Sequence, residues 1–324
     1  MWLVTGATGH IGNVLVRKLI ERGEKVRVLI LPNECRESVR GLDVEAVEGN
    51  VLNKESLYES MCGVKGVFHL AGVISIMPGS NEIVRKVNIE GTKNILRVAK
   101  EMNVGKFVYT SSIHAIQRVE EGIIDETLPY DPDNPYGEYD RAKAEATLEV
   151  QQAAQAGLEA VIACPSGVIG PYDFRGSLMG EVIHKAAESK PTLYVDGAYD
   201  FVDVRDVAEG LIATAEKGRK GESYILSGHK ISVRYLLETV REITGRRFFT
   251  MKIPFDLAKF ASLVTPMYYS VARVNPRFTP YSLEVLRSNA NISHAKATRE
   301  LGYTPRPLYE SIRDAVRWFV EQNK

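Results

Sequence analysis

The first twelve residues of the chain constrain its fold more than any other segment. A short apolar run, residues 1–5, leads directly into three evenly spaced glycines, Gly6, Gly9 and Gly12, and then into an amphipathic stretch, residues 13–22. A strand, a glycine turn and a helix in this order are typical of the first unit of a dinucleotide-binding fold. Glycine allows a tight turn and a close approach of backbone to pyrophosphate, and the helix N-terminus offers free N–H groups to phosphate. An ordinary glycine-rich loop could show the same spacing, so this interpretation needs support from elsewhere in the chain.

The composition is that of a globular protein with one large α/β domain, or with one such domain and a smaller lobe. Of 324 residues, 44% are hydrophobic and 25% are charged, and 41 basic residues balance 41 acidic ones. This balance indicates neither a nucleic-acid partner nor an anionic membrane. Cys35, Cys62 and Cys164 are few and scattered, which favours reduced thiols and a cytoplasmic protein. The histidines show no metal-ligand spacing, so we expect no metal, and the run before Gly6 is too short for a signal peptide.

Strand and helix patterns alternate through the first half of the chain, which predicts a Rossmann-type, doubly wound parallel sheet. Right-handed crossovers then place the carboxyl ends of the strands along one edge, where ligands bind. We therefore expect the glycine turn, Ala71-Gly72 and Ser111-Ser112 to converge in space. After the first strand, the expected strands are residues 25–31, 44–49, 66–72, 106–110 and 158–164, and the expected helices are residues 53–61, 82–102 and 135–156.

The pattern changes after Pro165, where turns become denser and helices outnumber strands. We expect a dinucleotide-binding domain over residues 1–165. A smaller, mostly helical substrate-binding lobe is expected over residues 166–324, with some segments returning to the sheet. Expected helices in this half are residues 203–217, 233–244 and 308–322.

The segment Phe255–Ala272 is markedly apolar, with only Asp256 and Lys259 charged. Its length raises the possibility of a membrane span, which those charges and nearby prolines weaken. We expect a buried or lid-forming helix pair here. An interface and a membrane contact stay open as alternatives.

Tyr139 and Lys143 lie four residues apart, so they share one face of the expected helix. A neighbouring ammonium favours the phenolate and lowers the pKa of a tyrosine, which makes a tunable proton donor and acceptor. Alone, the pair would fit a solvated helix face equally well. Its combination with the glycine turn and with Ser111-Ser112 is much less common by chance.

These motifs together resemble the extended short-chain dehydrogenases/reductases, the superfamily of the NAD-dependent epimerases and dehydratases. Within it, the chain is most similar to the branch of dihydroflavonol reductases and 3β-hydroxysteroid dehydrogenases. The resemblance covers essentially the whole chain and implies a Rossmann fold and hydride transfer. The segments that carry it are residues 5–12, 69–72, 88–92, 109–112, 139–143 and 200–207.

The resemblance also implies catalytic roles at four positions. Tyr139 would be the general acid/base, and Lys143 would lower its pKa and hydrogen-bond the cofactor ribose. Ser112 would hold the substrate oxygen, with Ser111 as its neighbour. Asn88 would position Lys143 through water, although it could instead simply cap a helix.

Further residues are implied to contact the cofactor or the substrate. Asparagine at Asn50 departs from the family's usual aspartate. His114, which could also just fill space, and Tyr172, Phe174 and Arg175 are candidates for the substrate pocket. The implied cofactor contacts are Thr5, Gly6, Thr8, Gly9, His10, Ile11, Gly12, Asn33, Arg36, Asn50, Val51, Leu70, Ala71, Gly72, Thr110, Tyr139, Lys143, Pro165, Ser166, Gly167 and Val168.

The end of the second strand bears on the choice of cofactor. A carboxylate there usually binds the ribose hydroxyls and selects NAD. The residues that follow are Leu31, Pro32 and Asn33, and no acid stands among them. Asn33, Arg36 or Arg40 could approach a 2′-phosphate, so we expect NADP(H) in preference to NAD(H).

The substrate class is indicated by what precedes the Asp-Phe-Val run at residues 200–202. Nucleotide-sugar epimerases and dehydratases usually carry an arginine there for the substrate pyrophosphate, and this chain has Tyr199. We therefore favour a small-molecule carbonyl or alcohol that is bulky and largely apolar. The alternatives are a nucleotide-sugar epimerase or dehydratase and, less favoured because Tyr139 and Lys143 are present, a non-catalytic regulator. The resemblance further implies a homodimer.

Overall fold

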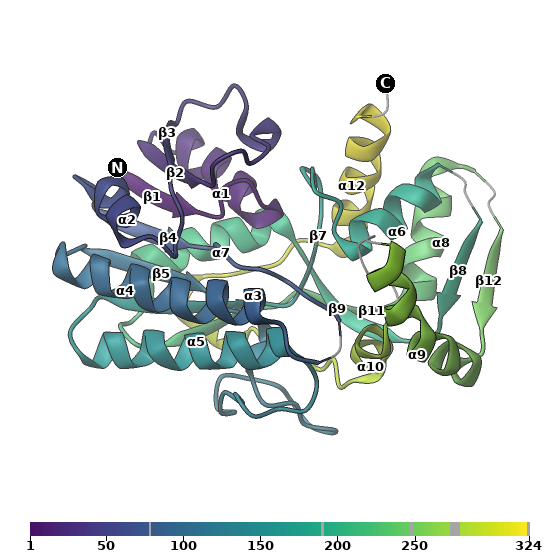
Figure 1. Ribbon diagram of the computed structural model, residues 1–324. Helices are drawn as coiled ribbons and strands as arrows, with labels where there is room; N and C mark the ends of the chain where they lie inside the picture. The colour runs from purple at the N-terminus through teal and green to yellow at the C-terminus, as the bar shows by residue number, and fades with distance from the viewer. Residues whose placement is uncertain (78, 189–190, 247–248, 273–278, 323–324) are drawn as a thin grey trace.

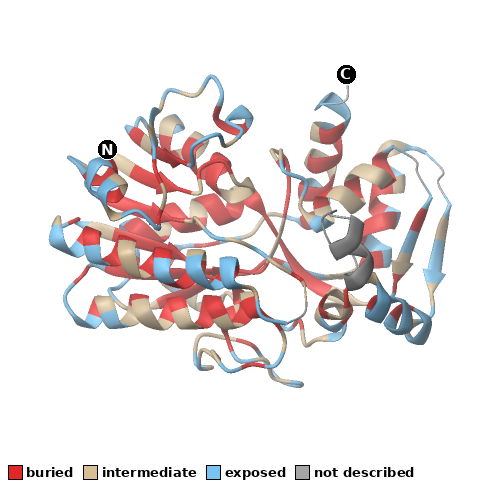
Figure 2. Ribbon diagram, in the orientation of Figure 1, coloured by how far each residue is buried: buried red, intermediate tan, exposed pale blue. Residues whose placement is uncertain are grey.

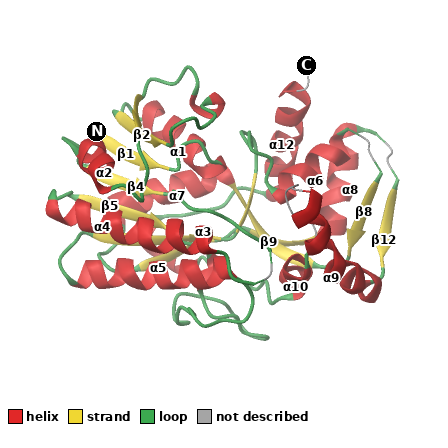
Figure 3. Cartoon of the chain, viewed as in Figure 1, coloured by secondary structure: helices red, strands yellow, loops and turns green. Residues whose placement is uncertain are grey.

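The computed structural model describes residues 1–77, 79–188, 191–246, 249–272 and 279–322. Two bodies lie side by side (Figures 1 and 3). One is a parallel sheet between two layers of helices, and the other is a smaller lobe of helices and short strands. The predicted doubly wound sheet is confirmed.

The large sheet has seven parallel strands in the order β10-β6-β5-β4-β1-β2-β3. Strand β1 lies between β2 and β4, so the chain reverses its direction of winding at β1. The carboxyl ends of β1 and β4 therefore border the crevice in which such sheets bind ligands. The strands are β1 (Trp2–Thr5), β2 (Val26–Ile30), β3 (Glu45–Glu48), β4 (Gly66–His69), β5 (Lys106–Thr110), β6 (Ala160–Pro165) and β10 (Ser223–Leu226).

Helices cover both faces of this sheet, and its central strands are buried (Figure 2). These strands carry apolar residues on both sides. Leu3 and Phe107 point to one core, whereas their neighbours Val4 and Val108 point to the other. The first core packs under α2 (Lys54–Met61), α4 (Gly91–Glu101) and α5 (Glu138–Gln155). The second packs under α1 (His10–Glu21), α7 (Val204–Lys217) and α11 (Ala295–Leu301).

The smaller lobe is built from segments after residue 165, although β10, α7 and α11 of that half belong to the large sheet's layers. Its strands form a three-stranded sheet, β11-β9-β7, and a parallel pair, β12-β8. These are β7 (Gly167–Ile169), β8 (Thr192–Val195), β9 (Ala198–Asp203), β11 (His229–Ser232) and β12 (Thr250–Ile253). The helices are α6 (Leu178–Ala187), α8 (Val233–Thr244), α9 (Phe255–Ala272), α10 (Pro280–Arg287) and α12 (Leu308–Gln322).

The helix expected over residues 82–102 is interrupted by a wide π-turn at Lys86–Glu90, between α3 (Glu82–Arg85) and α4. Asn88 lies in that turn, and its side chain hydrogen-bonds both the N–H and the C=O of Val73, each at 2.9 Å. The periodicity of apolar residues continues through such a turn, so the sequence pattern did not reveal it. Two short 3₁₀ turns lie at Glu37–Val39 and Ile113–Ala115.

The prediction of a buried helix pair over Phe255–Ala272 is wrong, whereas the lid stays a prediction. The segment forms one continuous helix, α9, and its Leu257, Phe260 and Leu263 side chains are largely exposed. Helix α9 nevertheless contacts α10. Among the described residues, no helix combines the length and the apolar character that crossing a bilayer requires.

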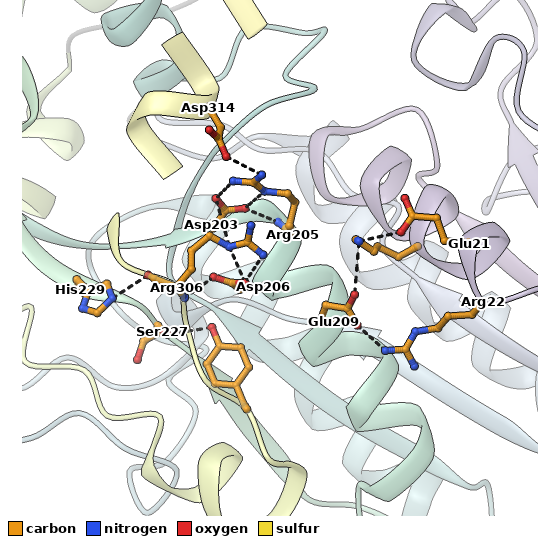
Figure 4. Close-up of polar contacts among 12 residues, drawn as sticks. Glu21, Arg22, Asp203, Arg205, Asp206, Glu209, Ser227, His229, Arg306 and Asp314 are labelled. Atoms are coloured by element: carbon orange, nitrogen blue, oxygen red, sulfur yellow. Dashed lines mark hydrogen bonds and ion pairs between the residues drawn. The ribbon is translucent and has the colours of Figure 1, made fainter. Parts of the chain in front are cut away.

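A network of ion pairs connects the lobe to α7 (Figure 4). Arg205 bonds the buried Asp203 and also Asp314 of α12, with N–O distances of 2.8 Å to each. Arg306, just before α12, pairs with Asp206 of α7 at 2.7 Å. Burial alone would raise the pKa of Asp203. The hydrogen bonds and the charge of Arg205 outweigh this effect and hold the pKa of Asp203 below its usual value. The network therefore fixes α12 against the helix that packs under the large sheet.

We expect Asp203→Asn to lower the free energy of unfolding by about 3 kcal/mol at pH 7, because it leaves the guanidinium of Arg205 without its buried partner. Asparagine can still cap α7, so the loss reports the ion pair. A carboxyl whose pKa is lowered by folding stabilises the fold above its unfolded pKa, and this contribution disappears as the pH falls through the folded value. The difference from the wild type should therefore shrink below about pH 4. Urea unfolding of both proteins at pH 7 and below about pH 4 measures this difference in the free energy of unfolding.

Glu209→Gln is the matched control for this prediction. Glu209 pairs with Arg22 in the same view (Figure 4), but both side chains are about 40% exposed. Exposed pairs contribute little, so we expect a change below about 0.5 kcal/mol. Equal losses from the two variants would contradict a special role for the buried pair.

Candidate active site

The glycine turn after β1 leaves no room for side chains at two of its three glycines. A Cβ on Gly6 would lie 2.7 Å from the backbone N of Ala71, and one on Gly12 would lie 2.1 Å from the backbone O of Gly6. Gly6 also has a φ of 69°, which glycine adopts without strain. No side chain caps α1 at its N-cap residue, Gly9. The N-terminus of α1 therefore keeps its N–H groups for an anion.

The ends of β1 and β4 are joined by hydrogen bonds at this turn. The hydroxyl oxygen of Thr5 accepts a bond from the N–H of Ala71 at 3.1 Å and pairs with the imidazole of His69 at 2.7 Å. Burial lowers the pKa of His69 to about 3, so its ring is neutral and structural. A Cβ on Gly72 would lie 2.7 Å from Asn88 Oδ1 and 3.8 Å from Lys143 Nζ. The predicted convergence of these strand ends is confirmed.

Ser112, Tyr139 and Lys143 meet beside this crevice. Ser112 follows β5 and hydrogen-bonds Tyr139, and its hydroxyl oxygen accepts the N–H of His114 at 3.2 Å. Lys143 donates to the C=O of Thr110 at 2.8 Å, which holds its Nζ at the carboxyl end of β5. The three side chains come from a strand end and from one face of α5.

The structure does not show the lowered pKa that was expected for Tyr139, and the role of Lys143 toward it stays a prediction. Burial raises the pKa of Tyr139 to about 12, and the hydrogen bond from Ser112 only partly opposes this. Burial also lowers the pKa of Lys143 to about 8, which weakens its electrostatic effect near neutral pH. Tyr139 is thus a protonated phenol, ready to donate, in this structure.

Neighbouring residues show which polar groups face the crevice. The hydroxyl of Ser111 bonds Thr147 at 2.6 Å inside the core, so Ser112 is the serine that reaches Tyr139. Thr110 keeps a buried hydroxyl with no hydrogen-bond partner among the described residues. The side-chain amide of Asn88 hydrogen-bonds the backbone of Val73. Its expected link to Lys143 through water stays a prediction.

The side chains expected near the adenosine are held by local contacts. Asn33 adopts a left-handed conformation, with φ 63°, in the turn after β2. Arg36 pairs with Glu48 of β3. The side-chain oxygen of Asn50 accepts the N–H of Leu52 at 2.9 Å, and Val51 is buried. Their roles toward the cofactor stay predictions.

Sequence reasoning missed Glu34, which places an acid where none was expected. The chain turns back after β2, so that Glu34 accepts hydrogen bonds from the N–H of Leu31 at 3.0 Å and the hydroxyl of Thr8 at 2.7 Å. Arg175 contacts both Thr8 and Glu34. Although burial raises it, these bonds hold the pKa of Glu34 below its usual value. The asparagine at position 33 was the available sequence signal, since asparagine tolerates the positive φ that such a turn requires.

The residues implied to contact the nicotinamide lie at the end of β6 and in β7. Ser166 donates to the carboxylate of Asp200, which also accepts the N–H of Gly228 at 2.8 Å. Gly167 packs against β9, because a Cβ there would lie 2.9 Å from the backbone O of Asp200. Pro165 is buried and Val168 is partly buried. These contacts join the large sheet to the lobe next to Tyr139's crevice.

Three residues proposed for the substrate pocket contact other parts of the molecule. Tyr172 lies under the guanidinium of Arg17 from α1, at 4.6 Å from its ring centroid. Phe174 packs edge-on against Trp318 of α12. Arg175 contacts the turn after β1 through Thr8, at 2.6 Å. The loop thus closes over α1, where the imidazole of His10 also bonds the C=O of Pro171 at 2.9 Å.

His114, by contrast, lies next to Tyr139, with ring centroids 6.5 Å apart. Its imidazole pairs with the hydroxyl of Tyr199 at 3.1 Å. Tyr199 occupies the position at which nucleotide-sugar enzymes were expected to carry an arginine. The phenolic hydroxyl of Tyr199 therefore stands in place of the guanidinium that was expected to bind a substrate diphosphate.

Comparison with known proteins decides the family. The model of the NAD dependent epimerase/dehydratase family matches residues 2–227. The chain belongs to this family. Sterol demethylase protein B of Methylococcus capsulatus is 34% identical over 99% of this chain and 98% of its own length. A putative dihydroflavonol 4-reductase of Synechocystis is 31% identical over 98% of this chain and 94% of its own length.

Solved structures agree with this assignment. The crystal structure of gox2253 superposes with a TM-score of 0.85 at 32% identity, covering 99% of this chain and 98% of that one. UDP-glucuronic acid 4-epimerase from Bacillus cereus, solved with UDP-glucuronic acid and NAD, gives a TM-score of 0.80 at 19% identity over 99% of each chain. The latter is a likeness of fold. The protein is an NAD-dependent oxidoreductase or epimerase/dehydratase at the level of its family.

The residues present fit the dinucleotide that the family uses. The glycine turn, where a Cβ on Gly9 would meet only the backbone O of Gly6, and the uncapped N-terminus of α1 suit a pyrophosphate. Lys143 lies at the edge of Gly72, within reach of a ribose placed along the crevice.

Proposed function

We propose that the protein reduces the carbonyl of a bulky, largely apolar small molecule, or oxidises the corresponding alcohol, by hydride transfer with NAD(P)(H). The observation that carries this proposal is the meeting of Ser112, Tyr139 and Lys143 beside the glycine turn. A general acid, a hydroxyl donor and a cation next to a dinucleotide crevice are suited to carbonyl reduction.

In this mechanism Tyr139 donates the phenolic proton to the carbonyl oxygen of the substrate. Ser112 hydrogen-bonds the same oxygen and supports the negative charge that develops on it. Lys143, anchored at the C=O of Thr110, would hold the cofactor ribose. When bound, the nicotinamide supplies or accepts the hydride.

The apolar substrate class rests on Tyr199 and on what the relatives are called. Tyr199 stands where an arginine was expected to bind a substrate diphosphate, and the nearby Arg118 is already paired with the buried Asp140. The relatives are named for a sterol demethylase, a dihydroflavonol reductase and a farnesylated dihydroquinoline-oxide ketoreductase. These names describe bulky molecules with little charge. The homodimer remains a proposal from family resemblance.

A substrate panel tests this function directly. Steroid, flavonoid and aryl ketones are incubated with NADH and with NADPH, and cofactor absorbance is followed in parallel with UDP- and GDP-sugars. We expect turnover of at least one apolar ketone and none of the sugar nucleotides. Turnover of a sugar nucleotide alone would establish the epimerase/dehydratase alternative.

The preferred cofactor is a separate proposal, and the position of Glu34 changes which cofactor we expect. The sequence-based preference for NADP(H) assumed that no acid follows β2. A carboxylate of lowered pKa at this place favours ribose hydroxyls and repels a 2′-phosphate. We therefore propose NAD(H) as the preferred cofactor. A preference for NADPH in the wild type would restore the original prediction and assign Arg175 to the phosphate.

We expect Glu34→Gln to shift the ratio of kcat/KM for NADPH over NADH upward by about tenfold, since it removes a negative charge beside the ribose. The amide can still accept from Leu31 and Thr8, so the turn should persist. Glu37→Gln is a nearby control that should leave the ratio unchanged. An unchanged ratio in Glu34→Gln would place the ribose elsewhere.

A further inference from the structure

A buried polar cluster surrounds the imidazole of His114. Asp140 is fully buried in the first turn of α5 and accepts two hydrogen bonds, from the hydroxyl of Tyr281 and from Arg118, each at 2.7 Å. Nδ1 of His114 faces the same two donors, with Tyr281 at 3.3 Å and Arg118 at 3.4 Å. Nε2 pairs with Tyr199. The proposed acid–base chemistry of Tyr139 makes no use of this cluster.

The count of protons in the cluster leaves two arrangements. Tyr281 gives its only proton to Asp140, because a carboxylate can only accept. If Nδ1 of His114 carries the proton, it donates to Tyr281, and the bare Nε2 accepts the proton of Tyr199. If Nε2 carries the proton, it donates to Tyr199, and Nδ1 accepts from Arg118. Burial lowers the pKa of His114, so one of these neutral forms prevails.

The two arrangements differ in what Tyr199 can offer the pocket. In the first, its oxygen keeps a lone pair that can accept from a substrate hydroxyl. In the second, its proton is free to be donated to a substrate carbonyl. Either way, the Tyr199 ring is fixed by stacking on His114, with an interplanar angle of 7° and centroids 5.9 Å apart. The His114 ring lies 5.9 Å from the Tyr199 ring and 6.5 Å from the Tyr139 ring, so one histidine neighbours both tyrosines.

We propose that Tyr199 and His114 form a second oxygen-binding subsite, which selects substrates that carry a hydroxyl or keto group close to the reacting carbonyl. Tyr199 hydrogen-bonds that second oxygen. His114 is a positioning residue for Tyr199, and Asp140 holds His114 through Tyr281 and Arg118. This inference rests on the proposed ketone reductase activity, and it narrows the substrates to 2-hydroxyketones, 1,2-diketones and similar compounds.

The test uses benzoin and deoxybenzoin, two aryl ketones that differ only in the hydroxyl group next to the carbonyl. The wild type should prefer benzoin by kcat/KM, and Tyr199→Phe should reduce that preference about tenfold, mainly through KM. His114→Phe should reduce it similarly, because Tyr199 then lacks its partner. Tyr224→Phe is the control. It too removes a tyrosine hydroxyl, one that bonds Glu300 at 3.0 Å on the edge strand β10 and makes no contact with His114.

The outcomes separate the two proposals. Equal use of the two ketones by the wild type, or an unchanged preference in Tyr199→Phe, would overturn the subsite and leave the reductase standing. Turnover of neither ketone would refute the reductase proposed for this ketone class, and the subsite with it. Lower stability in His114→Phe with the preference retained would make that residue merely structural.

Discussion

Tyr139→Phe is expected to lower kcat by about a thousandfold and to leave the affinity for the dinucleotide within about twofold. The variant removes only the phenolic oxygen, so the ring keeps its packing against Val84 and Ala142. What is lost is the proton that must reach the carbonyl oxygen. Burial keeps the pKa of Tyr139 at about 12, so the phenol carries this proton at neutral pH. Stopped-flow hydride transfer and cofactor fluorescence measure the two quantities.

The adjacent serines supply the control for this prediction. Ser112→Ala should lower kcat through the same reacting oxygen, whereas Ser111→Ala should leave it within about threefold, because the hydroxyl of Ser111 bonds Thr147 inside the core. Retained turnover in Tyr139→Phe would remove the proposed general acid. A parallel loss of cofactor binding would instead assign Tyr139 to holding the ribose.

The main sheet could be predicted because its signals are local. Each buried strand is a short apolar run with residues for both cores, as in Leu3 and Val4, and Asn53 caps α2 where the helix was expected to start. The order of the strands follows from right-handed crossovers, so the meeting of the glycine turn with Ala71 and Gly72 could also be predicted. The lobe offers fewer such signals, since β7, β8 and β12 are short and partly exposed.

What the sequence could not show depends on chain reversals and on burial. Glu34 lies four positions past β2, and only the turn at Asn33 brings its carboxylate back to Thr8. The pKa of Tyr139 depends on how deeply the α5 face is buried, which the four-residue spacing to Lys143 does not state. Tyr281 is far from His114 in sequence, so no spacing rule joins them.

Substitutions in the glycine turn are expected to have the second large effect. One position should affect the stability of the fold, and another should affect the binding of the dinucleotide. Gly12→Ala is expected to lower the free energy of unfolding by about 3 kcal/mol, because its Cβ would lie 2.1 Å from the backbone O of Gly6 and the turn cannot yield without moving β1 or α1. The three nearest atoms, on Gly6 and Ala7, all belong to the backbone, so no rotamer change relieves the contact. Thermal and urea unfolding without added cofactor measure the loss.

Gly9→Ala is the matched variant, and it separates protein packing from ligand space. Gly9 has an ordinary φ of −74°, and a Cβ there would meet only the backbone O of Gly6, at 3.2 Å. Its stability should change by less than about 1 kcal/mol. Its dinucleotide affinity should still fall about a hundredfold, because the added methyl group stands where backbone approaches the pyrophosphate. If Gly9→Ala bound the dinucleotide like the wild type, the phosphates would lie away from this turn. The glycines would then serve helix packing alone.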